Sequence, residues 1–469
     1  MDKRNLKVIF AGLFAAAFLV LSISGSLTTA GAQEIKLPPI KKTTLDNGLK
    51  VIVIEHHELP VVAFRLVFKS GAASDPSGKA GLADLTAGLL RKGTRTRTAT
   101  QIAEEIDFVG GGLGAGSSRD ATYATCKVLE KHFDVGLDLL SDIILNPAFA
   151  DEEIERLRKQ TLAAIKQQKD NPGAVADEKY RKFLFGDHPY GQPSEGTETS
   201  VAALTRDDIV SFHRNHYAPN NAILAVVGDV KPKVAIKKVE AKFSGWKGTQ
   251  IALPGYVQPP DIKGHQILLV DKPDLTQTYI RVGHLGIKRD NPDYFAVKVM
   301  NYILGGGGFS SRMMDEIRSK RGLTYGIGCK FDYNKLEGAY TVSTFTQNDS
   351  TAAAIRAIIE QIANFRSGGV TDTELKDTKS FYTGYFPLQL ETPSQIASQI
   401  LNVELHDLGE DYLKDYRKNI NAVTREDIQR AAQKYLDPNN LKLVVVSKAE
   451  DVKASLEPLG SIEVTSFLE

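Results

Sequence analysis

Residues 205–227 read "TRDDIVSFHRNHYAPNNAILAVV", and residues 424–446 read "TREDIQRAAQKYLDPNNLKLVVV". The two stretches align without a gap at an offset of 219 positions, which superimposes Thr, Arg, Asp, Ile and a Pro-Asn-Asn triplet. Each copy predicts a helix with a Thr N-cap and acidic first turn, then a turn at Pro-Asn-Asn, then an apolar strand. We therefore interpret the chain as two related halves, each of about 220 residues.

Each half shows the same order of predicted elements. The predicted strands are 49–54, 61–68, 266–270 and 277–283, and the long predicted helices are 150–168 and 351–365. Mostly antiparallel strands mixed with helices of this length favour an α+β fold, in which helices are layered on each sheet. We expect the two halves to be joined by a linker and to face each other across a cleft, where ligands usually bind.

The N-terminus is typical of a secretory signal peptide. Positive residues at 3–7 precede an apolar run at 8–21, and small residues follow as far as "AGA" at 30–32. The alternative is an uncleaved membrane anchor, but the run is shorter than the ~20 residues that a spanning helix needs. We expect cleavage after residue 32, export, and a periplasmic location if the organism is Gram-negative. No membrane span is expected after cleavage.

The remaining chain divides at a stretch rich in Gly and Pro. We expect an N-terminal domain at 33–244, a linker at 245–264 and a C-terminal domain at 265–469. The halves contain one cysteine each, Cys126 and Cys329, which cannot form a disulfide framework. A single bridge is arithmetically possible, and we favour two buried free thiols.

The composition narrows the class of partner. With 58 basic and 57 acidic residues, the formal net charge is +1, which argues against an extended nucleic-acid surface. A chain that is 42% hydrophobic and 25% charged has the composition of an ordinary soluble globular protein. No nucleic-acid partner is therefore expected.

Several stretches resemble the pitrilysin/insulinase family of zinc peptidases, of the processing-peptidase type. They are "DNGLKVIV" at 46–53, "SGAASDPSGKAGLADLTAGLLRKGT" at 70–94, the stretch 188–230 that begins "HPYGQPSEGTETS", and "GGGGFSSRMMDEIRSKRGLTYG" at 305–326. The similarity extends from about residue 45 to residue 448 and includes the duplicated architecture.

The motif on which zinc catalysis depends in that family is missing from this chain. Active members carry H-x-x-E-H, in which two histidines bind zinc and the glutamate is the general base. The equivalent residues here are "DLTAG", so Asp84 and Gly88 stand at the ligand positions and Ala87 at the base. A further zinc-binding glutamate falls at Ala164. Because Gly and Ala have no donor atoms, the resemblance implies a degenerate site with no metal or cofactor in this chain.

The histidines do not suggest a replacement site. His213 and His216 form H-x-x-H at a helix end with no acidic partner implied, so we favour a partly exposed helix end over a metal site. His56 and His57 are adjacent near a strand, so their side chains should point to opposite faces. His188 is expected to fix a loop. An active protease with a divergent metal site is therefore disfavoured.

The second half contributes the other candidate residues. Four consecutive glycines and a phenylalanine could let the backbone approach another chain or a peptide closely. The candidate substrate-binding residues are Gly305, Gly306, Gly307, Gly308 and Phe309. No lysine follows with the spacing of a phosphate-binding loop, so nucleotide binding is not expected.

The "R-G-L-x-Y" stretch implies a catalytic role through the resemblance. Arg321 and Tyr325 match residues that the family directs at the substrate carbonyl oxygen, where they stabilise developing charge. In this chain they would act in trans, on the active site of a partner subunit. The alternative is a surface salt bridge and a packed tyrosine.

These observations favour a non-catalytic subunit of an exported heterodimeric zinc peptidase. Its partner would be a subunit of the same family that carries H-x-x-E-H and the zinc, and this chain would close the substrate chamber. The substrate would be a peptide or an unfolded polypeptide, bound by addition to a sheet edge. The alternative is a peptide-binding or structural assembly protein with no role in proteolysis.

Overall fold

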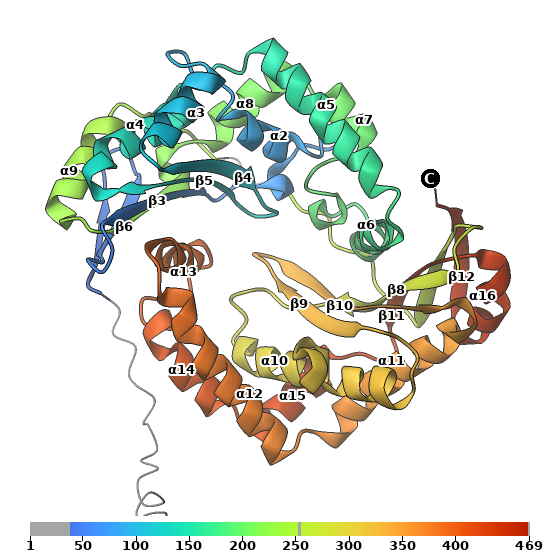
Figure 1. The fold of residues 1–469 in the computed structure, drawn as a ribbon. Coiled ribbons are helices and arrows are strands. Elements are labelled where there is room, and N and C mark those ends of the chain that lie inside the picture. The colour runs from blue at the N-terminus through green and yellow to red at the C-terminus, as the bar shows by residue number, and fades with distance from the viewer. Residues whose placement is uncertain (1–37, 252–254, 468–469) are drawn as a thin grey trace, which may run out of the picture. The chain divides into compact units, whose positions relative to one another are not determined.

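The computed structural model describes residues 38–251 and 255–467 (Figure 1). The predicted signal peptide lies outside the described residues. We call residues 38–244 the first half and residues 265–467 the second half. Helix α9 (Pro232–Phe243) ends just before the predicted linker, and strand β7 (His265–Asp271) begins directly after it. No helix in the described part of the chain is long and apolar enough to cross a membrane.

The first half contains a six-stranded sheet in the order β1-β2-β6-β3-β5-β4. All neighbouring strands are antiparallel except the β2–β6 pair. Its strands are β1 (Ile40–Thr44), β2 (Lys50–Glu55), β3 (Val61–Phe68), β4 (Gly112–Ser117), β5 (Thr122–Leu129) and β6 (Ala222–Gly228). Its other helices are α2 (Leu82–Leu89), α3 (Ala99–Phe108), α4 (Phe133–Leu145), α5 (Asp151–Gln168), α6 (Pro172–Phe185), α7 (Glu198–Ala203) and α8 (Arg206–His216).

The second half contains a six-stranded sheet in the equivalent order, β12-β7-β11-β8-β10-β9. Its other strands are β8 (Gln277–Leu285), β9 (Ile327–Tyr333), β10 (Glu337–Gln347), β11 (Leu441–Ser447) and β12 (Ser461–Ser466). Its helices are α10 (Tyr294–Asn301), α11 (Thr351–Gly368), α12 (Asp372–Tyr385), α13 (Pro393–Leu405), α14 (Tyr412–Ala422), α15 (Arg425–Tyr435) and α16 (Ala449–Leu456). The π-helical turns η5 (Tyr302–Gly306) and η7 (Met314–Lys320) lie between α10 and β9, and the 3₁₀ turn η9 (Phe386–Leu390) follows α12.

The internal repeat is confirmed as a structural duplication. Helix α8 and strand β6 in the first half have the same bounds as α15 and β11 in the second half, shifted by 219 residues. Thr205 and Thr424 both close a capping box, in which the Thr hydroxyl and an Asp carboxylate satisfy each other's backbone N–H groups. The predicted α+β fold with two homologous, mostly antiparallel sheets is confirmed.

One helix from each half packs on the sheet of the other half. Helix α6 belongs to the first half but packs on β8 and β11, and α13 belongs to the second half but packs on β3 and β6 (Figure 1). The two helices occupy equivalent places in the repeat. We call α6 and α13 the exchanged helices. The apolar side of α6 forms one core with second-half strands, including Val444 and Val446 of β11.

Ion pairs and hydrogen bonds between the halves hold the exchanged helices in place. On α6, Asp177 pairs with Arg281 of β8 at 2.5 Å, and the Tyr180 hydroxyl donates to the Tyr340 carbonyl oxygen at 2.9 Å. On α13, Glu404 accepts ion pairs from β1 and β2. Hydrogen bonds to both lysines lower the pKa of the Glu404 carboxyl although burial opposes that change. Because these partners lie in different halves, the contacts tie the two sheets into one folding unit.

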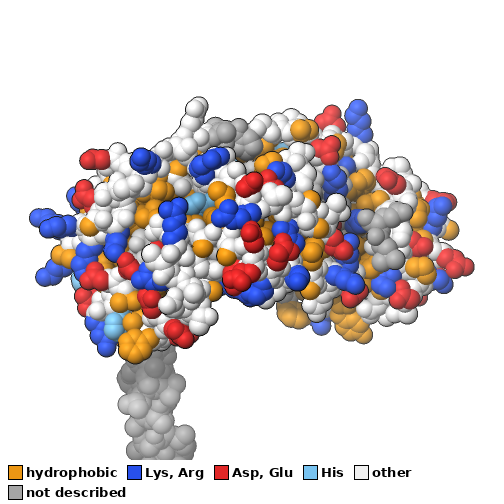
Figure 2. Space-filling model, turned by 90° about the horizontal axis from the view of Figure 1, so that it is seen from above, with side chains coloured by type: hydrophobic (Ala, Val, Ile, Leu, Met, Phe, Trp, Pro, Cys, Tyr) orange, Lys and Arg blue, Asp and Glu red, His pale blue; other side chains and the backbone are white. Residues whose placement is uncertain are grey.

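The charge pattern and the cysteines agree with the predictions from composition. On the face shown in Figure 2, basic and acidic side chains are interspersed, with no broad area of one sign. Cys126 and Cys329 are both buried and free, as predicted. Burial raises the pKa of each thiol to about 12, so neither is a reactive thiolate at neutral pH.

The packing of α6 on β8 can be tested by replacing two glycines with alanine. A Cβ atom at Gly283 in β8 would lie 1.9 Å from the Tyr340 carbonyl oxygen and 2.5 Å from the Tyr180 hydroxyl. We expect Gly283→Ala to lower the free energy of unfolding by at least ~2 kcal/mol, measured by urea denaturation, because α6 and the strands must move apart. Gly384→Ala in α12 is the control, since a Cβ there meets no atom within 4 Å. It should raise stability by about 0.5–1 kcal/mol. Equal effects of the two changes would contradict this packing.

Candidate functional site

Helix α2 carries the residues that replace the zinc motif. Its leucines face the first-half core, and the chain enters the helix through Gly81 at a φ of 91°. The Asp75 carboxylate accepts hydrogen bonds from the backbone N–H groups of Gly81 and Ala83, at 2.9 and 2.8 Å. These bonds satisfy donors at the start of the helix that would otherwise have no partner. Packing of the leucines and the hydrogen bonds of Asp75 therefore hold the helix in place.

The four degenerate positions lie in different environments. Asp84 is half-buried, Ala87 is fully buried, and Ala164 is exposed on α5. A Cβ atom at Gly88 would lie 3.0 Å from a methyl group of Leu157, so α5 packs closely over this position. In the described residues, no group of three His, Cys, Asp or Glu side chains lies close enough to hold a metal ion. One carboxylate beside Ala and Gly does not fit zinc, which needs three or four donors.

Asp84 is poorly suited to carry a charge in this environment. Burial raises the pKa of its carboxyl to about 6, and the negative charge of Glu195 contributes to the same change. An acid whose pKa is raised on folding stabilises the fold most at low pH. That stability is lost as the pH rises from the unfolded value near 3.8 to the folded value near 6.

Asp84→Asn should therefore stabilise the protein at neutral pH and not at pH 4. A change of about two pKa units corresponds to at most ~3 kcal/mol in the free energy of unfolding. Urea denaturation at pH 4 and pH 7.5 would measure the difference between the variant and the wild type. Glu195→Gln is the matched control and should give a smaller gain. If the variant is no more stable than the wild type at pH 7.5, the charge of Asp84 does not destabilise the folded protein.

The histidines noted in the sequence have structural partners. The His213 ring donates to the Ile144 carbonyl oxygen at 2.9 Å, and burial lowers the pKa of His213 to about 4. His216 bonds to the Ser70 hydroxyl at 3.1 Å. The His188 ring accepts from the Tyr190 backbone N–H at 3.0 Å and so fixes its loop, as predicted.

The four-glycine stretch packs against its own chain. A Cβ atom at Gly305 would lie 2.6 Å from the Cys329 sulfur, and one at Gly306 would lie 2.6 Å from the Asn301 amide nitrogen. Gly307 is similarly close to Tyr302, whereas Gly308 adopts a φ of 60° with open space around it. The close backbone approach expected for these glycines is thus made within the second half. Part of this stretch forms π-helix η5.

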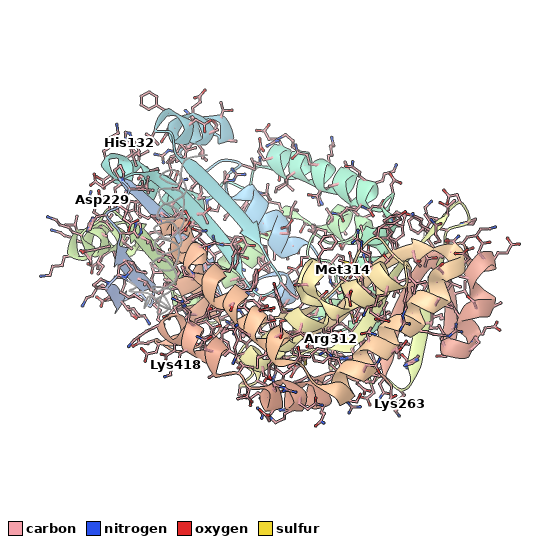
Figure 3. All side chains as sticks on the ribbon, turned by 60° about the horizontal axis from the view of Figure 1, so that its bottom comes forward. His132, Asp229, Lys263, Arg312, Met314 and Lys418 are labelled. Carbon is pink, nitrogen blue, oxygen red and sulfur yellow. The ribbon has the colours of Figure 1, made fainter. Side chains whose placement is uncertain are left out.

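The segment after the glycines is anchored by its arginines. Arg312, labelled with Met314 in Figure 3, pairs with Glu374 of α12 at 2.6 Å. Arg321 pairs with Glu316 at 3.1 Å and with Glu360 of α11 at 2.9 Å. The salt bridge that we considered as the alternative for Arg321 is therefore present. Most of the segment between Arg312 and Arg321 is the π-helix η7.

A different arginine lies beside Tyr325. Arg318 and Tyr325 line one cavity of about 340 Å³, together with residues of β10 that include Thr346. Tyr325 is 78% exposed, so it is not the packed tyrosine of the alternative interpretation. The Arg318 guanidinium also lies 4.8 Å from the ring centre of Phe309, which is 75% exposed. No carboxylate in the described residues lies within 4 Å of Arg318, so its guanidinium is available to a ligand.

Sequence reasoning selected Arg321 because it belongs to "R-G-L-x-Y", and that role stays a prediction, whereas the arginine that shares a cavity with Tyr325 is Arg318, which the sequence did not single out. Both arginines stand near the end of one helical segment, and residue type alone does not distinguish them. The difference lies in the acidic partners, because Glu360 of α11 is 39 residues away along the chain. No sequence signal marked that contact.

Strand β4 offers a free edge beside α2. Among the described residues it pairs with β5 alone, and it packs against α2. Leu113 and Ala115 contribute to the core on one face, so the alternating residues Gly112, Gly114 and Gly116 leave the other face without side chains. The Leu113 carbonyl oxygen accepts from Arg91 at 3.0 Å. An extended peptide could pair with the rest of this edge.

Comparisons with known proteins agree with this architecture. The family described as "Insulinase (Peptidase family M16)" matches residues 50–198, and the one described as "Peptidase M16 inactive domain" matches residues 203–382. An uncharacterized zinc protease of Mycobacterium leprae is 32% identical over 84% of this chain and 89% of its own length.

Solved structures give the same result. A peptidase M16 inactive domain from Pseudomonas fluorescens superimposes with a TM-score of 0.81 at 30% identity, over 87% of this chain and 98% of that one. A protease from Helicobacter pylori shares the fold, with a TM-score of 0.82 at 23% identity over 88% of this chain and 100% of that one. The duplicated α+β halves, with a helix at the place of a zinc motif, define a chain with a two-domain metallopeptidase fold. This chain belongs to the peptidase M16 (insulinase) family and lacks its H-x-x-E-H motif.

Proposed function

We propose that this chain is the non-catalytic subunit of a two-subunit zinc peptidase. The observation that carries the proposal is a contrast between the two halves. Asp84, Ala87 and Gly88 leave α2 without a metal site, whereas the partly exposed Arg318 and the exposed Tyr325 line one cavity. Donors of this kind are useful only beside a reacting group. In this proposal a partner subunit of the same family, carrying H-x-x-E-H and the zinc, supplies that group.

The chemistry of the two side chains suits peptide hydrolysis. When water attacks a peptide bond, the carbonyl oxygen gains negative charge. The Tyr325 hydroxyl and the Arg318 guanidinium can both donate hydrogen bonds to that oxygen, and the guanidinium adds a positive charge. The zinc of the partner would activate the water. This chain would position the substrate and stabilise the charge.

Substrate would bind through the backbone. The open edge of β4 provides N–H and C=O groups to an extended peptide or unfolded polypeptide, and the space beside Gly112 is open. Such binding discriminates little between sequences. The exposed ring of Phe309 beside Arg318 adds an apolar contact near the proposed site.

We also propose that the complex acts outside the cytoplasm. The charge, apolar run and "AGA" of residues 1–32 support this location, which would be the periplasm in a cell with two membranes. The proposed partner would then need an export signal of its own.

The test is hydrolysis of a quenched peptide, with zinc content measured on the same samples. The chain would be assayed alone and mixed with an H-x-x-E-H family member encoded in the same genome. We expect no zinc and no turnover alone, and turnover when mixed. Arg318→Ala and Tyr325→Phe should each lower kcat of the mixture by about 100-fold, as for loss of one oxyanion donor.

Arg321→Ala is the matched control for Arg318→Ala. It removes an arginine from the same segment, but one held in surface ion pairs, so we expect less than about a threefold change in kcat. If Arg321→Ala is the damaging change, the assignment of the arginine is wrong. Stoichiometric zinc and turnover by the isolated chain would overturn the proposal. No peptide hydrolysis in any mixture would favour the peptide-binding or assembly role.

A further inference from the structure

A second cavity lies in the second half, among α10, β9, α13, α14 and η9 (Figure 1). Its volume is about 370 Å³, and tyrosines, phenylalanines and amide side chains line most of it. Two cations, Arg289 and Lys298, also face it. Asp332 is the one carboxylate among the described residues that line it, and this carboxylate pairs with Lys330 at 3.1 Å. The cavity therefore contains positive charge that the protein does not neutralise.

Arg289 is the more deeply buried cation. Its side chain is only 6% exposed, and no carboxylate of the described residues lies within 4 Å. The guanidinium donates to the Tyr412 hydroxyl at 2.6 Å and lies over the Tyr294 ring, 3.8 Å from its centre. These contacts leave most of its five N–H donors without a protein acceptor among the described residues. A buried charge without a counter-ion is costly to fold.

Lys298 lies on α10 and faces the same space. Its ammonium group is 3.4 Å from the Tyr294 hydroxyl and lies near the rings of Tyr382 and Tyr416, at 4.8 and 5.2 Å from their centres. It forms no ion pair within the described chain. Beyond the cavity wall, burial and then the charge of Arg289 lower the pKa of His406, although Asp120, Asp290 and Asp407 act in the opposite direction.

We propose that this cavity binds the C-terminal carboxylate of a short peptide. The planar guanidinium of Arg289 matches both oxygens of a carboxylate, and Lys298 adds a second charge. Amide side chains such as Gln399 and Asn402 can pair with a peptide backbone, and the surrounding rings can hold an apolar side chain. A volume of about 370 Å³ is at the small end of the range for ligand pockets. The site lies apart from α2, Arg318 and Tyr325, so binding to the isolated chain tests it independently of the proposed peptidase role.

The experiment is isothermal titration calorimetry on the full chain with three probes. They are an N-acetylated dipeptide with a free C-terminal carboxylate, the same dipeptide as its C-terminal amide, and inorganic phosphate. We expect the free acid to bind, and the amide to bind at least tenfold more weakly. Equal binding of acid and amide would overturn the proposal. Phosphate that binds as tightly as the acid and displaces it would overturn the assignment to a peptide terminus.

Three variants connect the binding to the cavity. Lys298→Gln should weaken binding of the free acid at least tenfold, and Arg289→Lys, which keeps the charge but loses the planar fork, should weaken it too. The control is Lys418→Gln on α14, because Lys418 is labelled in Figure 3, is 79% exposed and does not line the cavity. It should change affinity less than twofold. Thermal unfolding of each variant confirms folding, and binding that survives both cavity changes in folded protein would overturn the proposal.

Discussion

The fold depends on the burial of both faces of the strands β6 and β11. Strand β6 lies inside the first-half sheet and strand β11 inside the second-half sheet. Every residue of both strands is buried, which requires a covering layer on each face of the sheet. Each half provides helices for one face of its own sheet, and the exchanged helices α6 and α13 cover the other half's strands. Asp177 and Glu404 then pair with cations across the halves. Each half completes the core of the other. Neither half is therefore expected to be stable alone.

This arrangement explains why α2 holds its position in the fold although it lacks the zinc motif. The helix is held by its leucines in the core and by Asp75 at its start, so its stability does not depend on the residues that face a metal in active relatives. Leu157 packs over the space at Gly88. In the second half, Arg318 and the exposed Tyr325 line a cavity of their own.

The sequence predicted those features of the fold that depend on interactions between residues close together in the chain. The repeat, the Thr caps at 205 and 424, the central strands and the free thiols could all be read from the sequence, because capping and apolar periodicity act over a few residues. The exchange of helices could not, since α6 has the same amphipathic pattern whichever sheet it covers. The π-helical turns and the ion pairs of Arg321 depend on tertiary contacts. The cavity at Arg289 gathers residues from 289 to 416, which no local motif connects.

The two sheets end in edges of opposite character. Strand β9 carries Lys330 and Asp332, a charged pair with side chains 63% and 35% exposed, and such charges discourage another strand from pairing with that edge. Strand β4, at the equivalent position, has three glycines and no charged residue. Duplication supplied two edges of the same kind, and only one of them is protected against strand addition. Of these two equivalent edges, β4 is therefore the one that can accept an extended segment, whereas the charges on β9 oppose such an addition.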